Sequence, residues 1–473
     1  PAPLMHKRNA RRITAGNIED DLDKIAECDW VIEVVLENLE IKRSLYAKIE
    51  EHRSPGTYVS SNTSSIPLEQ LVEGRSEDFT KNFMITHFFN PPRYLRLLEL
   101  VTGDKTDPKA VAVVRDFCDR KLGKGVVVCH DTPGFIANRI GAFWLQAGVN
   151  EAFDLDLSIE EADAIMSRPV GIPKTGIFGL IDLVGLDLMP HLSKSLLSNL
   201  PKTDAYHDLY QEYDLINKLI SEGYTGRKGK GGFYRLNTEG GQRVKESISL
   251  RTGKYAPSDK AKPAAVQASK DGGIRALVTH DDKSGQYAWN VLSKTLGYAA
   301  SLVGEIADNV YDIDRAMKLG YNFKKGPFEL IDDMGAGWFA EQLKKHDLKV
   351  PEIVEKAAAA DGFYKITDGQ KQYFGRDGQY HDIPLEEGVL LLEDIKLGSK
   401  PVKRNSSASL WDIGDGVLCL EFTSKMNALD DKIMFMIYEA IGQIGDGSGE
   451  YKALVVYNEG SNFSAGANLG LAL

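Results

Sequence analysis

Short apolar runs alternate with helical patterns between residues 30 and 131, and this alternation limits the fold more than any other feature. The strand-length runs are "WVIEVVL", "GTYVSS", "NFMITHF", "LLELVTG" and "GVVVCHD". Amphipathic segments such as "EIKRSLYAKIEEH" and "DPKAVAVVRDFCDRKLG" separate several of them. Strands that alternate with helices predict βα units around a mostly parallel sheet. We therefore expect an α/β protein that opens with a doubly wound domain.

A histidine and a glutamate occupy neighbouring strands of this predicted sheet. In "HFFNPP", two prolines end the strand, so His87 lies at a carboxyl end, where α/β sheets form their crevice. Glu99 follows 12 residues later, inside the apolar strand "LLELV". Histidine exchanges protons near neutral pH, and a paired carboxylate would fix its tautomer. The pair predicts general acid/base chemistry; a purely structural histidine is the alternative.

Two further polar groups are candidates for substrate contacts. "SNTSS" (61–65) follows a strand, and Asn138 lies in the first turns of the helix that "TPGFIANR" begins. Their hydroxyl and amide groups could orient a carbonyl or a hydroxyl. Turn and N-cap chemistry is the alternative for the serines, and a helix surface position is the alternative for Asn138.

No glycine-rich nucleotide turn is found in a suitable context. "GAGWFA" (335–340) has the spacing but follows the helical "FELIDDM" instead of a strand, so we reject it. The doubly wound domain is therefore predicted to be incomplete, without its first strand, turn and helix. We accordingly expect the chain as given to bind a dinucleotide far more weakly than a version extended by that strand, turn and helix.

An internal repeat follows the α/β region. "GIFGLIDLVGLD" begins at 176 and "GPFELIDDMGAG" begins at 326, 150 residues apart, and an acidic helical stretch precedes each copy. Two related all-α units that pack on each other are expected. Residues 237–284 and 376–407 are interpreted as a polar connector and a linker.

Composition excludes several classes of protein. The formal charge of -11 disfavours nucleic-acid partners, and no apolar run approaches the roughly 20 residues of a membrane span. Four cysteines without C-x-x-C spacing predict reduced thiols, no metal site and a cytoplasmic location.

The motifs together resemble the 3-hydroxyacyl-CoA dehydrogenase family of multifunctional β-oxidation enzymes. The similarity rests on "VLENLEIK", "SNTSSI", "HFFNPP" with "LLELV", and "DTPGFIANR". "GRKGKGGFYR" and both "G-x-F-x-L-I-D" copies resemble the C-terminal helical domain of that family. The final segment, with "SKMNALD" and "NFSAGANLG", resembles the opening of an enoyl-CoA hydratase/isomerase (crotonase-like) domain.

This resemblance implies a role for each matching residue. His87 would be the general base, Glu99 its partner, and Ser64 and Asn138 the substrate contacts. The matching cofactor positions are Glu37, Lys42, Ser64, Asn90 and Lys228. Ala467 would give one N–H of the hydratase oxyanion hole; the rest of that site is missing from the sequence, so we expect no hydratase activity from this chain.

The implied organisation is an incomplete Rossmann-like domain, two all-α dehydrogenase domains and a partial crotonase-like segment. Its boundaries are predicted at 1–131, 132–236, 237–284 (connector), 285–375, 376–407 (linker) and 408–473.

The implied activity is NAD-dependent oxidation of (S)-3-hydroxyacyl-CoA to 3-oxoacyl-CoA. The implied partners are an acyl-CoA substrate and NAD rather than NADP, with a homo-oligomer or a thiolase as a further association. Two alternatives are open: another NAD-dependent hydroxy-acid dehydrogenase, and a non-catalytic fragment whose helical repeats serve assembly.

Overall fold

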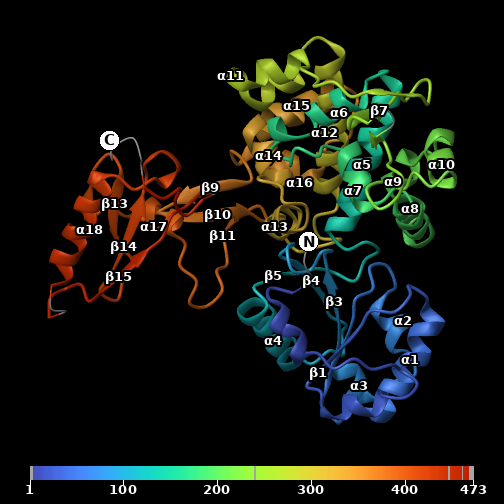
Figure 1. The fold of residues 1–473 in the computed structure, drawn as a ribbon, viewed down its shortest axis with the longest axis horizontal. Coiled ribbons are helices and arrows are strands. Elements are labelled where there is room, and N and C mark those ends of the chain that lie inside the picture. The colour runs from blue at the N-terminus through green and yellow to red at the C-terminus, as the bar shows by residue number, and fades with distance from the viewer. Residues whose placement is uncertain (1–3, 239–240, 446–447, 461, 468–473) are drawn as a thin grey trace. The chain divides into compact units, whose positions relative to one another are not determined.

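The computed structural model describes residues 4–238, 241–445, 448–460 and 462–467. The chain forms two compact units (Figure 1). The first comprises Pro1–Phe363 with Phe374–Gln379, and the second comprises Tyr364–Tyr373 with Tyr380–Leu473. Each unit is described by itself.

The first unit opens with a five-stranded sheet in the order β1-β2-β3-β4-β5. The β3–β4 pair is antiparallel and the other three pairs are parallel, which confirms the mostly parallel sheet. The strands are β1 (Trp30–Glu33), β2 (Tyr58–Ser61), β3 (Phe83–Phe88), β4 (Leu97–Val101) and β5 (Gly125–Val128). The helices are α1 (Leu39–His52), α2 (Leu68–Val72), α3 (Glu77–Lys81) and α4 (Pro108–Asp116).

Helices cover both faces of this sheet, with α4 on one side and α1 and α2 on the other (Figure 1). Met84 and Leu100 pack with Val114 of α4. On the opposite face, the rings of Tyr46 of α1 and Phe83 lie 5.3 Å apart. Successive side chains of a strand point to opposite faces, so His87, which shares the parity of Phe83, lies on the face away from α4.

Helices dominate the rest of the first unit. The first group is α5 (Ala137–Asp154), α6 (Ile159–Ile165), α7 (Phe178–Val184), α8 (Leu188–Asn199), α9 (Ala205–Leu209) and α10 (Asp214–Ser221). The second group is α11 (Ala264–Val278), α12 (Lys283–Ser301), α13 (Val310–Tyr321), α14 (Pro327–Met334), α15 (Ala336–Lys345) and α16 (Glu352–Ala359). Within the described ranges, no helix is both long and apolar enough to cross a bilayer.

The two helical repeats pack on each other through α5 and α12, as predicted. Both helices are buried over most of their length, which fits a central position in the helical layer. The rings of Phe143 and Tyr298 stack with their centroids 3.9 Å apart. The hydroxyl of Tyr287 donates to the carbonyl of Gly148 at 3.0 Å.

In each helical repeat, a buried aspartate binds the start of the following helix. Asp163 of α6 accepts the backbone N–H groups of Phe178 and Gly179 at the start of α7, at 2.7 and 3.1 Å. Asp314 of α13 does the same at the start of α14, at 2.9 and 3.1 Å. A carboxylate that accepts the free N–H groups of a first helical turn is stabilised there. The sequence repeat therefore corresponds to a repeated contact.

The ranges interpreted as a connector and a linker contain regular structure, which corrects their description. Residues 237–284 hold most of a three-stranded antiparallel sheet, whose strands are β6 (Tyr234–Asn237), β7 (Val244–Ile248) and β8 (Tyr255–Pro257), and the whole of α11. Residues 376–407 hold β11 (Tyr380–Asp382), α17 (Leu392–Gly398) and β12 (Lys403–Arg404). Short polar hairpins rich in glycine and lysine have the composition of linkers, which explains the misreading.

The second unit contains a βαβ pattern in the segment that resembles the opening of a crotonase-like domain. The strands β14 (Val417–Phe422) and β15 (Ala453–Val456) are parallel and flank α18 (Asp431–Ile444) in the chain. With β12 and β13 (Ala408–Asp412) they form a sheet in the order β12-β13-β14-β15. Leu410 and Leu420 pack against Ile433 and Met436 of α18. A separate sheet consists of β9 (Tyr364–Thr367), β10 (Gln370–Phe374) and β11.

Asp163 makes the stability of the helical layer depend on pH. Burial raises the pKa of Asp163 to about 7, although hydrogen bonds from Tyr234, Phe178 and Gly179 lower it. The folded protein then holds a proton that the unfolded chain releases near pH 4, so this group's contribution to stability falls as the pH rises from about 4 to about 7. Measured by urea denaturation, the unfolding free energy of Asp163→Asn should decrease less between about pH 4 and about pH 7 than that of the wild type. An unchanged pH slope in the variant would contradict this assignment.

Candidate active site

His87 and Glu99 face each other across the β3–β4 pair, as the sequence predicted. They are directly opposite in the antiparallel register, and Nδ1 of His87 lies 2.6 Å from Oε2 of Glu99. Glu99 is 0% exposed and His87 is 7% exposed. A charge without water needs partners inside the protein, so the imidazole is one of the groups that make a buried carboxylate tolerable.

The second oxygen of Glu99 is held by the start of α5. Oε1 accepts the backbone N–H groups of Ile136 and Ala137 at 3.1 and 2.8 Å. These groups lack partners within the helix, and the positive end of the helix dipole favours a negative charge there. Glu99 therefore joins the sheet to the first helix of the helical layer.

The turn before α5 explains why this helix begins at Ala137 and not at the start of "TPGFIANR". Gly134 and Phe135 have φ values of 78° and 48°, which no helical residue adopts. A left-handed conformation is costly for a bulky residue such as Phe135, so the surrounding contacts must hold it. The turn directs the N–H groups of residues 136 and 137 toward Glu99.

Two aromatic rings surround the imidazole of His87. The centroids of Phe89 and Phe135 lie 5.0 and 5.6 Å from that of His87. Glu99 occupies Nδ1, and no residue that the structure describes makes a hydrogen bond to Nε2. Because an ionised Glu99 accepts the proton on Nδ1, Nε2 is the nitrogen with a lone pair for another molecule.

Ser64 and Asn138 are distant from this pair in the chain, and the turn before α5 connects them to it. The carbonyl of Ser64 accepts the N–H of Gly134 at 3.1 Å, in the turn that leads to α5. Asn138 follows directly on Ala137 and is half-buried. The structure thus brings four predicted residues, His87, Glu99, Ser64 and Asn138, around the single segment 134–138.

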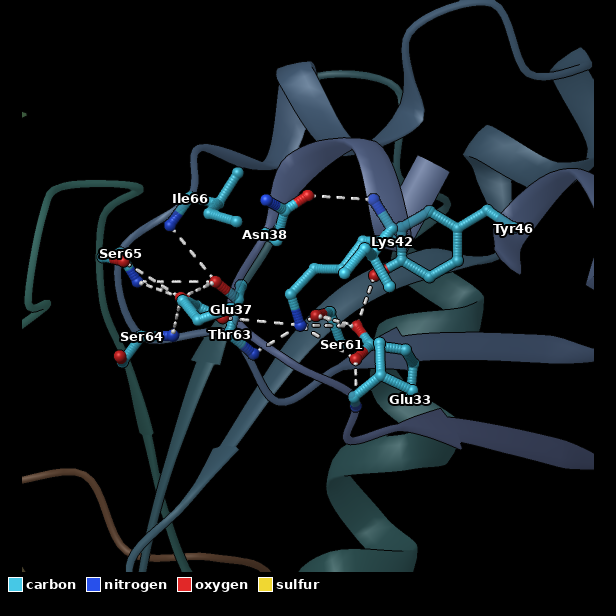
Figure 2. A network of polar contacts seen from close by, with 12 residues as sticks. Glu33, Glu37, Asn38, Lys42, Tyr46, Ser61, Thr63, Ser64, Ser65 and Ile66 are labelled. Carbon is cyan, nitrogen blue, oxygen red and sulfur yellow. Dashed lines mark hydrogen bonds and ion pairs between the residues drawn. The ribbon is translucent and has the colours of Figure 1, made fainter. Parts of the chain in front are cut away.

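Lys42 lies inside a buried polar network (Figure 2). Its side chain is 1% exposed, and Nζ contacts the carboxylate of Glu33 at 2.8 and 3.0 Å and that of Glu37 at 3.4 Å. Glu33 also accepts the hydroxyls of Tyr46 and Ser61, each at 2.6 Å. Lys42 therefore forms ion pairs with two carboxylates near the ends of β1 and β2.

Glu37 organises the "SNTSS" turn. One carboxylate oxygen accepts the N–H groups of Ser64 and Ser65 at 3.0 and 3.1 Å, and the hydroxyl of Thr63. Burial alone would raise the pKa of Glu37, but the bond from Thr63 and the charge of Lys42 lower it. The Ser64 hydroxyl points away from Glu37 (Figure 2). The turn thus presents that hydroxyl outward.

The structure leaves two predicted cofactor residues apart from this network. Asn90 is exposed three residues after His87. Lys228 is exposed in the loop between α10 and β6, where the N–H of Arg227 donates to the carbonyl of Asp182 in α7. No hydrogen bond or ion pair among the described residues connects Lys228 to Glu37 or Lys42.

Sequence reasoning missed Glu33 and Asn62. The Oδ1 atom of Asn62 accepts the N–H of Phe88 at 2.9 Å, which ties the end of β2 to the residue after His87. Asn62 lies within the quoted "SNTSS" and Glu33 within "WVIEVVL", where a lone acid among apolar residues was the available signal.

Comparison with family models identifies the chain. The model described as "3-hydroxyacyl-CoA dehydrogenase, NAD binding domain" matches residues 3–132. The model of the "3-hydroxyacyl-CoA dehydrogenase, C-terminal domain" matches residues 134–236 and 285–373. The chain belongs to the 3-hydroxyacyl-CoA dehydrogenase family. The family resemblance and the Rossmann-like and helical parts of the predicted fold are thereby confirmed.

Relatives of this dehydrogenase family match the whole chain. A probable 3-hydroxyacyl-CoA dehydrogenase of Bacillus subtilis is 38% identical over 482 residues, covering 100% of this chain and 60% of that protein. A putative fatty acid oxidation complex trifunctional enzyme of Rickettsia felis is 38% identical, covering 100% of this chain and 62% of that protein. The chain thus spans about three fifths of the length of these relatives.

A shorter relative agrees with this family assignment, and a solved structure agrees with the fold. A probable 3-hydroxyacyl-CoA dehydrogenase of Deinococcus radiodurans is 37% identical, covering 53% of this chain and 71% of that protein. The crystal structure of 3-hydroxybutyryl-CoA dehydrogenase from Escherichia coli K12 superposes with a TM-score of 0.55 at 22% identity. It covers 72% of this chain and 83% of that chain, and it supports the fold.

The site fits the nicotinamide cofactor that the family implies. The position of Lys42 differs from the direct cofactor contact that the resemblance implied. The outward Ser64 hydroxyl and the Nε2 of His87 lie where the strands of the sheet end, the region in which such sheets bind nucleotides. Lys42 already has two carboxylate partners, so its charge serves Glu33 and Glu37.

Removal of the Lys42 charge tests whether Lys42 stabilises the fold through Glu33 and Glu37. We expect Lys42→Met to lower the unfolding free energy by about 3 to 5 kcal/mol, because it leaves Glu33 buried without its cation. The double variant Glu33→Gln, Lys42→Met should recover part of that loss in urea denaturation. Lys24→Met, which removes an exposed partner of Asp21, is the control and should leave the unfolding free energy nearly unchanged. An equally small loss for Lys42→Met would contradict the buried network.

Proposed function

We propose that the chain carries out NAD-dependent oxidation of (S)-3-hydroxyacyl-CoA to 3-oxoacyl-CoA. The observation that carries the proposal is the buried His87–Glu99 pair at the strand ends, with Nδ1 and Oε2 2.6 Å apart. The family match and the names of the relatives support the reaction class.

His87 takes the proton of the substrate 3-hydroxyl at Nε2. Nδ1 is committed to Glu99, so the imidazole is held in the tautomer whose Nε2 accepts. When Nε2 gains the proton, the ring becomes positive, and the adjacent carboxylate stabilises that charge. The N–H groups of Ile136 and Ala137 hold the other oxygen of Glu99, so the carboxyl group stays oriented toward the imidazole.

Ser64 and Asn138 orient the substrate. The Ser64 hydroxyl points out of its turn, and Asn138 lies in the first turn of α5, next to the residue that binds Glu99. Hydroxyl and amide groups in these places would hold the 3-oxygen and the thioester carbonyl, which contributes mainly by positioning. NAD, when bound, supplies the acceptor for the hydride from C3.

The cofactor is proposed to lie along the ends of β1 to β3. Glu37 and Ser64 would contact it, Asn90 and Lys228 would contact it from exposed positions, and Lys42 would act through the Glu37 carboxylate. A cation that fixes a carboxylate also fixes the turn that the carboxylate caps. The Glu37 bonds to Thr63 and Ser64 give this coupling a direct route.

We propose also that the dehydrogenase is one part of a bifunctional enzyme with an enoyl-CoA hydratase. The β14-α18-β15 unit and the name of the Rickettsia felis relative support this part. Ala467, which would offer one oxyanion N–H, is exposed and forms a parallel bridge with Leu429. Association with a thiolase stays a prediction.

Replacement of His87 tests the dehydrogenase assignment. In the full-length gene product, His87→Gln should lower kcat for acetoacetyl-CoA reduction by about 10² to 10⁴, the usual loss when a general base is removed. Glu99→Gln should lower kcat strongly with a modest change in KM, because the charge acts on the imidazolium and not on the ground state. Crotonyl-CoA hydration by the same variants is the matched control and should not change. Normal reduction by His87→Gln would refute the assignment.

A further inference from the structure

The second helical repeat reaches the His87 site through α13. Gly320 packs so closely on the sheet that a β-carbon there would lie 2.8 Å from Cδ2 of Leu97. The guanidinium of Arg315 donates to the carbonyl of Val126 in the edge strand β5 at 2.9 Å. The helix therefore packs on β4, which carries Glu99, and on its neighbour β5.

Tyr321, the last residue of α13, continues the aromatic packing around His87. Its ring lies 6.3 Å from that of Phe89 in an edge-to-face arrangement, and the Phe89 ring lies 5.0 Å from the imidazole. The Tyr321 ring also packs edge-to-face on Trp144 of α5 at 6.3 Å. Such pairs have preferred geometries, so Tyr321 limits how Phe89 can lie.

Gly141 makes room for Tyr321 on α5. A β-carbon at residue 141 would lie 1.9 Å from the Tyr321 hydroxyl, so only glycine lets the ring approach this close. Asn138 is three residues earlier on the same helix and therefore on the same face. One side chain from the second repeat thus contacts the helix that carries Asn138 and the ring that covers His87.

We propose that Tyr321 is a positioning residue for the dehydrogenase reaction. Through Phe89 it fixes the imidazole of His87, and through Gly141 it fixes the start of α5, which holds Glu99. The second repeat then fixes the geometry of the active site, in addition to completing the helical layer. This inference rests on the proposed dehydrogenase function.

A second contact between the repeats supports the same role for the second repeat. Arg139, the neighbour of Asn138, is fully buried, and its guanidinium contacts Glu305 at 3.0 Å. The same guanidinium makes a cation–π contact with the ring of Tyr298 in α12, 5.8 Å from its centroid. The first turns of α5 are therefore contacted from the second repeat at two positions that follow Asn138, namely Arg139 and Gly141.

The test removes the Tyr321 ring in the full-length gene product. We expect Tyr321→Leu to lower kcat for acetoacetyl-CoA reduction by about 10- to 100-fold with little change in KM, as for a small misplacement of catalytic groups. Tyr321→Phe keeps the ring against Phe89 and should retain most of kcat. Trp338→Leu, a half-buried aromatic elsewhere in the second repeat, controls for general loss of stability and should leave kcat unchanged.

A readout that needs no turnover separates this proposal from the proposed function. The rate at which diethyl pyrocarbonate modifies His87, with His87→Gln as the blank, should rise in Tyr321→Leu and not in Trp338→Leu. If His87→Gln keeps its activity but the modification rate rises in Tyr321→Leu, the function fails and the positioning contact stands. An unchanged modification rate and an unchanged kcat in Tyr321→Leu would overturn the proposal.

A double-variant cycle tests the Gly141 contact directly. Gly141→Ala adds a methyl group where the Tyr321 hydroxyl lies, so it should lower kcat about as much as Tyr321→Leu. In the Tyr321→Leu background the added methyl meets a smaller side chain, and the two losses should not add. Gly148→Ala crowds Ile177 within the first repeat and is the matched control. Additive losses for Gly141→Ala and Tyr321→Leu would contradict the contact.

Discussion

The buried carboxylate of Glu99 is the interaction on which the arrangement of the first unit depends. One oxygen meets the imidazole of His87 and the other meets two N–H groups at the start of α5. A charge that is 0% exposed is costly unless every such partner is in place. The register of β3 on β4, the left-handed turn at Phe135 and the position of α5 are therefore linked through a single side chain.

The same principle operates twice more in this unit. Lys42 lies between Glu33 and Glu37 beneath the strand ends, and each buried aspartate of the helical repeats accepts the N–H groups of a following helix. Lys42, Glu33 and the two aspartates are buried, and each has specific partners, so their positions are closely defined. Buried carboxyl groups and their partners thus fix the contacts between elements, and apolar packing fills the space between those contacts.

Sequence patterns predicted the elements better than their junctions. The His87–Glu99 pair could be predicted because both residues lie on strands, where the period of two and the turn length fix the register. The start of α5 could not, because its turn depends on Gly134 and Phe135 in conformations that only tertiary contacts hold. Residues 237–284 were misread because polar hairpins and linkers share a composition.

The site residues also differ in whether the sequence predicts their positions. Ser64 follows a strand end and Asn138 lies at the start of a helix, places where polar groups gather, so their positions beside the turn before α5 could be predicted. The role of Lys42 was not, since a lysine in an amphipathic helix gives no sign that it is 1% exposed. Nor could the contact of Tyr321 with the catalytic helix be foreseen, because it joins positions 180 residues apart in the chain, at Gly141 and Tyr321.

The tautomer of His87 tests the central claim most directly. In ¹⁵N-histidine-labelled full-length protein at a pH of about 8.5, above the ordinary histidine pKa, the His87 signals can be assigned by comparison with His87→Gln. If Glu99 orders the site, nitrogen chemical shifts will show a neutral ring with its proton on Nδ1 and a lone pair on Nε2. A ring with its proton on Nε2 would contradict the account, because Nδ1 could not then donate to Glu99.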